Sequence, residues 1–203
     1  TSRMQVYLIR HGKTQSNLEH RYQGRLDDPL CEQGILLLQQ KKAAGIYPAP
    51  DRVICSPKQR CIQTARIICG EGLPLFLEPE LRETDFGKFE GKTYEELKDD
   101  ADYLRWMESN GTGEIPGGES QAQMSERCIK GFCQQMEHLS QTACEQILFV
   151  VHGGTIMALL ERFADPAQPF SAFYVENGEG YCLEIEHWNP QNRYPIVPIQ
   201  WKE

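Results

Sequence analysis

Three short apolar segments rich in strand-forming residues lie far apart in the chain, and each is followed at once by a helix signal. The segments are 4–9, 52–55 and 147–151. Such uninterrupted apolar runs are typical of strands that are buried on both faces. Ser56 and Pro57 follow the second segment as a predicted helix cap and first helical residue, and Gly153 opens an apolar helical stretch after the third. Strands that alternate with helices predict an α/β fold, here a single domain with a mostly parallel central sheet flanked by helices.

Further elements are expected between and beyond these segments. Apolar spacing or a capping pattern predicts helices over 32–44, from Thr93 onward, and over 119–139. The stretch 177–180 predicts the turn of a hairpin between 173–176 and 181–186. Residues 109–120, rich in glycine, are expected to form a loop near a site or a linker. The chain has 203 residues, of which 40% are hydrophobic, so we expect one domain over 1–203.

Charge and hydropathy limit the classes of partner. The formal net charge is −8, which argues against nucleic acid as a partner, because binding a phosphate backbone requires clustered Lys and Arg. A small anionic ligand stays compatible with this charge, since a pocket can be locally basic. No apolar run reaches the roughly 18 residues of a membrane span, and the N-terminus shows no charged-then-apolar leader, so we expect no membrane partner and a cytoplasmic location. The sequence leaves the oligomeric state open.

The eight cysteines do not form a metal-binding pattern. No two of them have C-x-x-C spacing and no histidine cluster accompanies them, which argues against a structural zinc site. In a cytosolic chain of this size, we expect them to be small, reduced core residues instead of disulfides.

Polar residues stand where each of the three predicted strands ends. Arg10 and His11 end the first strand, Ser56 ends the second with Arg60 one turn into the following helix, and His152 ends the third. A lone histidine after a strand is usually structural, but here two His-Gly pairs occupy equivalent places. Ligands of parallel sheets bind beyond the carboxyl ends of the strands, so we expect these side chains to share one site.

The residue types at this edge suit a phosphate group. Arginine offers a planar fork of donors for phosphate oxygens, and the helix N-termini after Ser56 and His152 add N–H groups that favour anions. A neutral histidine ring is nucleophilic, and the positive charge of Arg10 and Arg60 disfavours its protonation. We therefore expect His11 to attack phosphorus and His152 to donate a hydrogen bond to a phosphate oxygen.

A leaving alkoxide also needs a proton, and the segment 78–87 contains four candidate donors. They are Glu78, Glu80, Glu83 and Asp85. Their spacing does not choose among them, because most acidic residues in such a run are simply solvated.

A larger set of motifs extends over nearly the whole chain. These are Arg10-His11-Gly12 with Thr14 and Asn17, Gln23-Gly24, Ser56-Pro57 with Arg60 and Thr64, Leu81-x-Glu83 with Gly87, Pro116-Gly117-Gly118-Glu119-Ser120, and His152-Gly153. Together they resemble the histidine phosphatase superfamily, the phosphoglycerate-mutase-like proteins. The combination is highly specific, although no single motif is.

The resemblance implies a role for each matched residue. His11 would be the phosphorylated nucleophile, while Arg10, Arg60 and His152 would bind the phosphoryl group. Glu83 would be the proton donor and later the base for water. The phosphate and substrate pocket would be lined by Asn17, Gln23, Gly24 and the backbone of Gly153. The implied partner is a small phosphorylated metabolite, with no metal and no cofactor.

Within the superfamily, 86–97 and 116–120 are most similar to the α-ribazole phosphatases of cobalamin biosynthesis, so α-ribazole 5′-phosphate is a candidate substrate. Other small-molecule phosphatases share much of this pattern. Two positions depart from it. Lys13 stands where the family usually has Glu or Gln, and either adds charge beside His11 or points to solvent. Cys31 stands where the family usually has Thr, a better helix cap.

Two alternatives compete with net hydrolysis. Phosphoglycerate mutases of this superfamily usually carry an Arg-His-Tyr-Gly segment after the catalytic acid, whereas Glu83 is followed here by Thr84-Asp85-Phe86-Gly87, without a cation for a substrate carboxylate. A non-enzymatic phospho-ligand-binding protein on the same fold is the second alternative. The complete catalytic set disfavours it.

Overall fold

A seven-stranded sheet organises residues 3–202, which are the residues that the computed structural model describes. Thr1, Ser2 and Glu203, the ends of the expected domain, lie outside the described residues, so its boundaries stay a prediction. The strands are β1 (Met4–Arg10), β2 (Arg52–Cys55), β3 (Leu75–Leu77), β4 (Gln146–Val151), β5 (Ala164–Asp165), β6 (Gly180–Ile185) and β7 (Tyr194–Ile199). Their order across the sheet is β3-β2-β4-β1-β6-β7-β5.

The pairing is mostly parallel, as expected. The strands β3, β2, β4 and β1 pair side by side in parallel, and β5 pairs in parallel with β7. Strand β6 runs antiparallel to both of its neighbours, β1 and β7. The register places Arg10 opposite Val151 and Cys55 opposite Val150, so the residues that follow β1, β2 and β4 emerge at one edge of the sheet.

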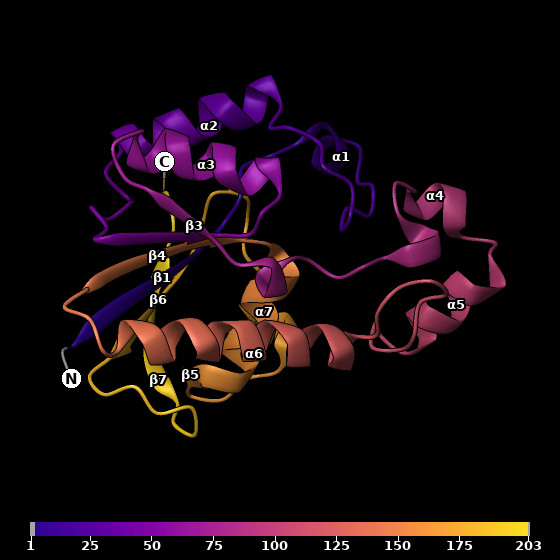
Figure 1. The fold of residues 1–203 in the computed structure, drawn as a ribbon. Helices are drawn as coiled ribbons and strands as arrows, with labels where there is room; N and C mark the ends of the chain where they lie inside the picture. The colour runs from indigo at the N-terminus through magenta and orange to yellow at the C-terminus, as the bar shows by residue number, and fades with distance from the viewer. Residues whose placement is uncertain (1–2, 203) are drawn as a thin grey trace.

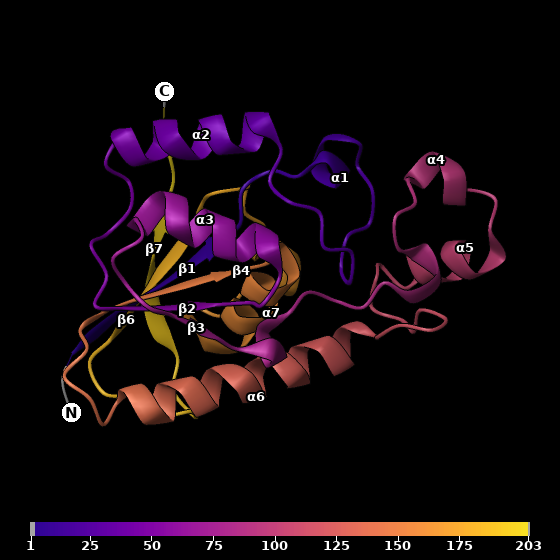
Figure 2. The same ribbon diagram turned by 45° about the horizontal axis from the view of Figure 1, so that its top comes forward.

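Helices cover both faces of this sheet (Figures 1 and 2). The α-helices are α1 (Gln15–Leu18), α2 (Glu32–Ala43), α3 (Gln59–Cys69), α4 (Tyr94–Leu97), α5 (Ala101–Glu108), α6 (Gln121–Leu139) and α7 (Gly153–Phe163), and the 3-10 turns are Pro79–Leu81, Gly87–Phe89 and Phe170–Phe173. Helices α2 and α3 lie on one face, and α6 and α7 lie on the other. The short helices α4 and α5 extend from one end of the molecule, away from the sheet.

The core has two layers, one under each pair of helices. Along β4, Leu148 and Val150 pack toward α2 and α3, whereas Ile147, Phe149 and Val151 pack toward α6 and α7. This two-sided burial explains why the strand is apolar at every position instead of alternating. A third, smaller cluster lies beneath α4 and α5 and contains Phe89, Leu97, Tyr103 and Ile115.

The strands predicted over 4–9, 52–55 and 147–151 and the helices predicted over 32–44 and 119–139 agree with the structure to within one or two residues. Thr93 caps α4 with a complete capping box, and Cys31 caps α2 by accepting the Gly34 N–H at its sulfur, 3.4 Å away. All eight cysteines are free, and Cys55, Cys61, Cys128 and Cys182 are buried. Within residues 3–202 no helix has the length and apolarity needed to cross a membrane.

The prediction that Ser56 caps α3 is wrong. The N-cap residue is Lys58, whose side chain makes no capping bond, and the helix starts at Gln59. Asp27, from a distant loop, supplies the cap by accepting the Gln59 N–H at 2.8 Å. The Ser56 hydroxyl is instead engaged by His152, which local sequence cannot reveal.

The predicted hairpin around 177–180 is also wrong. Residues 170–173 form a 3-10 turn, and β6 pairs with β1 and β7. The Gly178 N–H donates to the Arg10 carbonyl at 2.8 Å, and the Asn177 side chain donates to the His11 carbonyl at 3.1 Å. The turn therefore docks against the end of β1 instead of closing a hairpin.

We predict that Phe132→Ala lowers the free energy of unfolding by about 3–5 kcal/mol, because this fully buried ring lies within 5.8 Å of the rings of Phe149, Phe163 and Trp188. Urea denaturation measures the change. The matched control is Phe76→Ala, which removes a ring that is 43% exposed. The control should cost about 1 kcal/mol or less, and equal losses for the two variants would contradict the assignment of the core.

Candidate active site

His11 lies at the end of β1 with its ring almost fully buried. Its Nδ1 lies 2.6 Å from the Gly12 carbonyl oxygen, which can only accept a hydrogen bond. The proton therefore sits on Nδ1, and the lone pair on Nε2 is free to attack. Burial, followed by the charges of Arg60 and Arg10, lowers the pKa of His11 well below its usual range and keeps the ring neutral.

His152 follows β4 as the N-cap residue of α7, and its ring centroid lies 5.4 Å from that of His11. Arg60 Nη2 lies 3.4 Å from Nδ1, and because a guanidinium only donates, Nδ1 is the acceptor. The Nε2–H then donates to the Ser56 hydroxyl at 2.7 Å. Burial, Arg60 and His11 lower the pKa of His152. In this neutral ring, Nε2 carries the proton and Nδ1 is the acceptor. Donation to a phosphate oxygen therefore requires a second proton, on Nδ1.

Arg60 on α3 is fully buried although it carries a charge. It donates to the carbonyls of Gly24 and Leu26, and no carboxylate within residues 3–202 forms an ion pair with it or with Arg10. Arg10 donates to the Val175 carbonyl at 2.9 Å. Burying a cation without a counter-charge is costly, and an anionic ligand beside it would offset that cost.

Several donors near these groups lack partners. Among the described residues, the buried nitrogens without a hydrogen bond include Arg10 Nε, Arg60 Nε and Gln23 Nε2, with Trp188 Nε1 the remaining one. Buried donors usually find an acceptor, and three of these four belong to predicted site residues. A phosphate group could satisfy donors of this kind.

Glu83 lies on an irregular segment and reaches the N-terminus of α7. Its Oε2 accepts the Gly154 N–H at 3.0 Å, and its Oε1 accepts the Thr84 N–H at 2.9 Å. A Cβ at position 154 would lie 2.2 Å from Oε1, so the carboxylate approaches this closely only because position 154 is glycine. A Cβ at Gly153 would lie 3.3 Å from Arg10 Nε. The two glycines therefore bring the acid and the arginine to one place.

A cavity of about 380 Å³ opens from Glu83, and its walls are mainly apolar and aromatic. They include Tyr22, Phe86, Trp106, Ile115, Met124, Met157, Phe170 and Tyr174. Its charged lining residues are Glu83 and Glu119. Asn110, Gly111 and Ile115 come from the loop 109–120, so this segment lies beside the site.

The other predicted pocket residues contact the site residues or their neighbours. Gly24 accepts from Arg60 Nη2 at 3.1 Å, and a Cβ there would lie 1.9 Å from the Thr84 carbonyl. Gln23 is buried and accepts from Thr14 at 3.1 Å. Asn17 accepts from Asn177, whose amide also donates to the carbonyl of His11.

Lys13 lies in a separate depression of about 380 Å³ together with Arg10, Asn17 and Arg21. It does not line the cavity that opens from Glu83.

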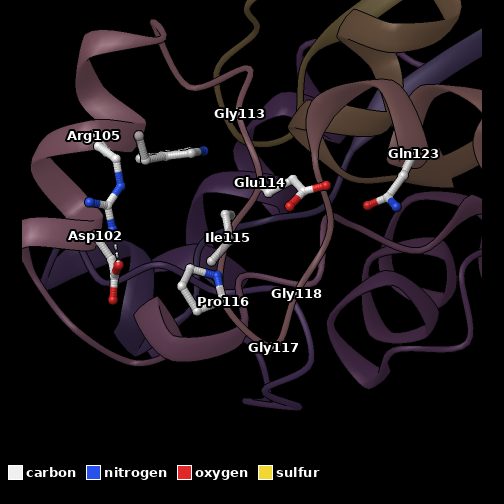
Figure 3. A pocket seen from close by; sticks show the side chains of 10 residues that line it. Asp102, Arg105, Gly113, Glu114, Ile115, Pro116, Gly117, Gly118 and Gln123 are labelled. Carbon is white, nitrogen blue, oxygen red and sulfur yellow. Dashed lines mark hydrogen bonds and ion pairs between the residues drawn. The ribbon is translucent and has the colours of Figure 1, made fainter.

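A larger cavity of about 740 Å³ is lined by α5 and the loop 113–118 (Figure 3). Asp102 and Arg105 of α5 face it from one side, and Glu114 and Gln123 from the other. Trp106 and Ile115 line both this cavity and the one at Glu83, so they separate the two. Glu83 and Gly154 line the cavity at Glu83 but not this larger one, so the smaller cavity is the one that adjoins the site residues.

Within the part of the chain that the structure describes, no group of three or more His, Cys, Asp and Glu side chains is arranged to hold a metal ion. The expectation of a metal-free site stays a prediction.

Sequence reasoning missed two residues, Asn177 and Arg127. Asn177 left no signal, because its role depends on how the 170–180 segment docks on β1. Arg127 did leave one, since it sits beside Met124 and Cys128 on the apolar stripe of α6, an unusual place for a charge.

The sequence profile of the histidine phosphatase superfamily (branch 1) matches residues 6–194, and the chain therefore belongs to this superfamily. The expected class, a phosphatase with a histidine nucleophile, agrees with that family.

Two curated relatives carry different names. The chain is 30% identical over 186 residues to the adenosylcobalamin/α-ribazole phosphatase of Salmonella typhimurium, covering 90% of this chain and 91% of that protein. It is 42% identical over 131 residues to the probable phosphoglycerate mutase GpmB of Cronobacter sakazakii. That second match spans only 61% of this chain and 59% of the relative.

The fold is similar to that of a solved structure, the α-ribazole phosphatase of Shigella flexneri, with a TM-score of 0.82 and 29% identity. The match covers 97% of this chain and 96% of that one. The predicted fold class and resemblance are thereby confirmed.

We predict that His11 and His152 remain neutral at about pH 6, below the usual pKa of histidine near 6.5, because burial and nearby arginines lower both pKa values. Nitrogen-15 NMR should show the proton of His11 on Nδ1 and that of His152 on Nε2. His11→Asn and His152→Asn assign the signals, and the urea-unfolded chain is the control, in which both rings should charge. A charged His11 ring in the folded protein at this pH would refute the proposed environment.

Proposed function

We propose that this chain is a phosphomonoester hydrolase that forms a phosphohistidine at His11, acts in the cytoplasm and takes α-ribazole 5′-phosphate as its substrate. The observation that carries the proposal is the buried, unpaired charge of Arg60 beside two neutral histidines. Such a site favours a dianion, because the ligand supplies the missing counter-charge.

The proposed reaction has two steps. His11 Nε2 attacks phosphorus, the bond from phosphorus to the ester oxygen breaks, and Glu83 gives its proton to the leaving alkoxide. Glu83 then takes a proton from water, which attacks the phosphohistidine and releases inorganic phosphate. Arg10 and Arg60 bind the phosphoryl oxygens throughout. Burial, and after it the positive charge of Arg60, lower the pKa of His152. The bound dianion offsets that charge and draws the Arg60 guanidinium from Nδ1 to the phosphate, so that Nδ1 takes up a proton and donates to a phosphoryl oxygen.

The cavity beside Glu83 supports a substrate with a planar, apolar leaving group. Its aromatic walls suit a benzimidazole nucleoside such as α-ribazole, and relatives that match nine tenths of the chain carry that name. Its charged lining residues are Glu83 and Glu119, so the lining offers no cation to pair with the carboxylate of a phosphoglycerate. Phosphoglycerate mutase activity, the name carried by the shorter match, is therefore the weaker candidate.

Free cysteines support the cytoplasmic part of the proposal. All eight are unpaired, as expected in a reducing compartment. The net charge of −8 supports a small metabolite instead of nucleic acid as the partner.

We predict release of phosphate from α-ribazole 5′-phosphate by the wild type, without a metal requirement, and loss of that release in His11→Ala. Rapid mixing with labelled substrate should trap the label on His11, and a chelated, dialysed sample should keep full activity. 3-Phosphoglycerate is the control substrate, on which we expect little hydrolysis and no isomerisation with a bisphosphate primer. Label on another residue would refute the mechanism, and efficient isomerisation would refute the proposed net reaction.

We predict that Glu83→Gln slows phosphorylation by an alkyl phosphate ester by about 10²–10⁴-fold, and phosphorylation by p-nitrophenyl phosphate much less, because an aryl leaving group needs little protonation. Single-turnover burst rates are compared, since Glu83 also serves the hydrolysis of the phosphoenzyme. Glu80→Gln and Asp85→Asn are the controls, which should show no dependence on the leaving group. If one of them shows the steep dependence and Glu83→Gln does not, the proton donor is assigned wrongly.

A further inference from the structure

Glu83 stands on a segment that has no regular structure of its own. It lies between the 3-10 turns Pro79–Leu81 and Gly87–Phe89. A general acid must be held in a narrow range of positions, so an irregular segment that carries one needs support from elsewhere.

The guanidinium of Arg127 supplies such support from α6. Its Nη1 donates to the carbonyls of Glu80 at 2.7 Å and Arg82 at 2.8 Å, and its Nη2 donates to the carbonyl of Glu83 at 3.1 Å. The arginine therefore binds the backbone up to and including the proposed acid. Its side chain is only 8% exposed, which makes these bonds strong and their loss costly.

Glu119 completes the arrangement from the other side. Its carboxylate pairs with Arg127 Nε at 2.9 Å and Nη2 at 2.8 Å, and its Oε1 also accepts the Asp85 N–H at 2.9 Å. The Glu119 N–H donates to the Asp85 carbonyl at 2.9 Å. One buried ion pair thus binds the chain on both sides of Glu83, while the Gly154 N–H holds the carboxylate itself.

This arrangement explains why glycine occurs in the Pro116–Ser120 motif. A Cβ at Gly118 would lie 2.3 Å from the Asp85 carbonyl, and one at Gly87 would lie 2.3 Å from the Pro116 carbonyl. The two segments approach this closely because glycines face each other, and the approach brings the Glu119 carboxylate to Arg127.

We propose that Arg127 and Glu119 are positioning residues for the proton donor Glu83. The proposal rests on the proposed function, because it requires Glu83 to be the acid. Arg127 exerts its effect only through Glu83, so its effect on the rate disappears once Glu83 can no longer donate a proton.

The test compares Arg127→Lys, Arg127→Met and Glu119→Gln in single-turnover assays with an alkyl phosphate ester and with p-nitrophenyl phosphate. Lysine keeps the charge but lacks the planar fork, so it cannot bind three carbonyls and a carboxylate together. We expect each variant to slow phosphorylation by the alkyl ester by about 10–100-fold, and phosphorylation by the aryl ester by less than about threefold. In a Glu83→Gln background, the same substitutions should not lower the phosphorylation rate further.

Arg82→Gln is the matched control. This arginine stands on the same segment and is 42% exposed; its side chain donates to the nearby Pro79 carbonyl at 3.1 Å and pairs loosely with Glu80 at 3.6 Å. It should behave as the wild type. Losses that are equal for both esters, or that add to the effect of Glu83→Gln, would overturn the proposal, since they indicate a general structural role. Unchanged rates in all three variants would overturn it as well.

Two further measurements keep the outcome decisive. Glu119→Gln preserves side-chain shape, so it carries the test if Arg127→Met does not fold, as urea denaturation shows. His11→Ala is measured alongside. If it retained phosphate release, the proposed function would fail whatever Arg127 does, whereas a normal loss in His11→Ala with no leaving-group effect at Arg127 would refute the positioning role alone.

Discussion

The parallel register of β1, β4 and β2 is the constraint on which the site depends. Strand β4 lies between the other two, and all three end at the same edge of the sheet. His11 and His152 therefore meet with ring centroids 5.4 Å apart, although 141 positions separate them in the chain. Ser56, at the end of β2, reaches the same place and fixes the second ring. Strand pairing thus brings together side chains that are far apart in the sequence.

Burial then sets the chemistry of these groups. Water is excluded from both rings, and two arginines stand nearby, so protonation of either histidine is disfavoured. Main-chain carbonyls, not carboxylates, solvate Arg60. Carbonyl dipoles leave the net positive charge in place, whereas an ion pair would cancel it. The site therefore keeps an attraction for anions while the ring of His11 stays neutral, a combination that an exposed cluster of the same residues would not achieve.

The sequence predicts features that depend on local pattern and fails where distant contacts decide. The apolar runs at β1, β2 and β4, the capping box at Thr93 and the amphipathic face of α6 were all readable. Ser56 looked like a helix cap because local spacing favoured it, but His152 takes its hydroxyl and Asp27 caps the helix. Residues 173–176 looked like a strand because a turn signal separates them from 181–186. No local signal shows that β6 pairs with β1 instead. Spacing does not indicate which carboxylate of 78–87 is the proton donor, and only the resemblance to the family selected Glu83.

Glu83 shows why such a residue escapes pattern analysis. Strand ends fix the histidines, so their positions follow from rules about sheets. The acid instead belongs to a segment shaped by Gly154 on α7, Arg127 on α6 and Glu119 from the loop before it. None of these partners is near in sequence. The side chains of Arg127 and Glu119 bind main-chain atoms of the segment, and main-chain atoms carry no residue signature. The one local trace is a charge on an apolar helix face. A buried arginine at such a position must satisfy its donors, and carbonyls of an irregular segment are the acceptors that regular structure leaves free. A charged residue that interrupts the apolar stripe of a helix thus indicates that its side chain binds the backbone of a neighbouring irregular segment.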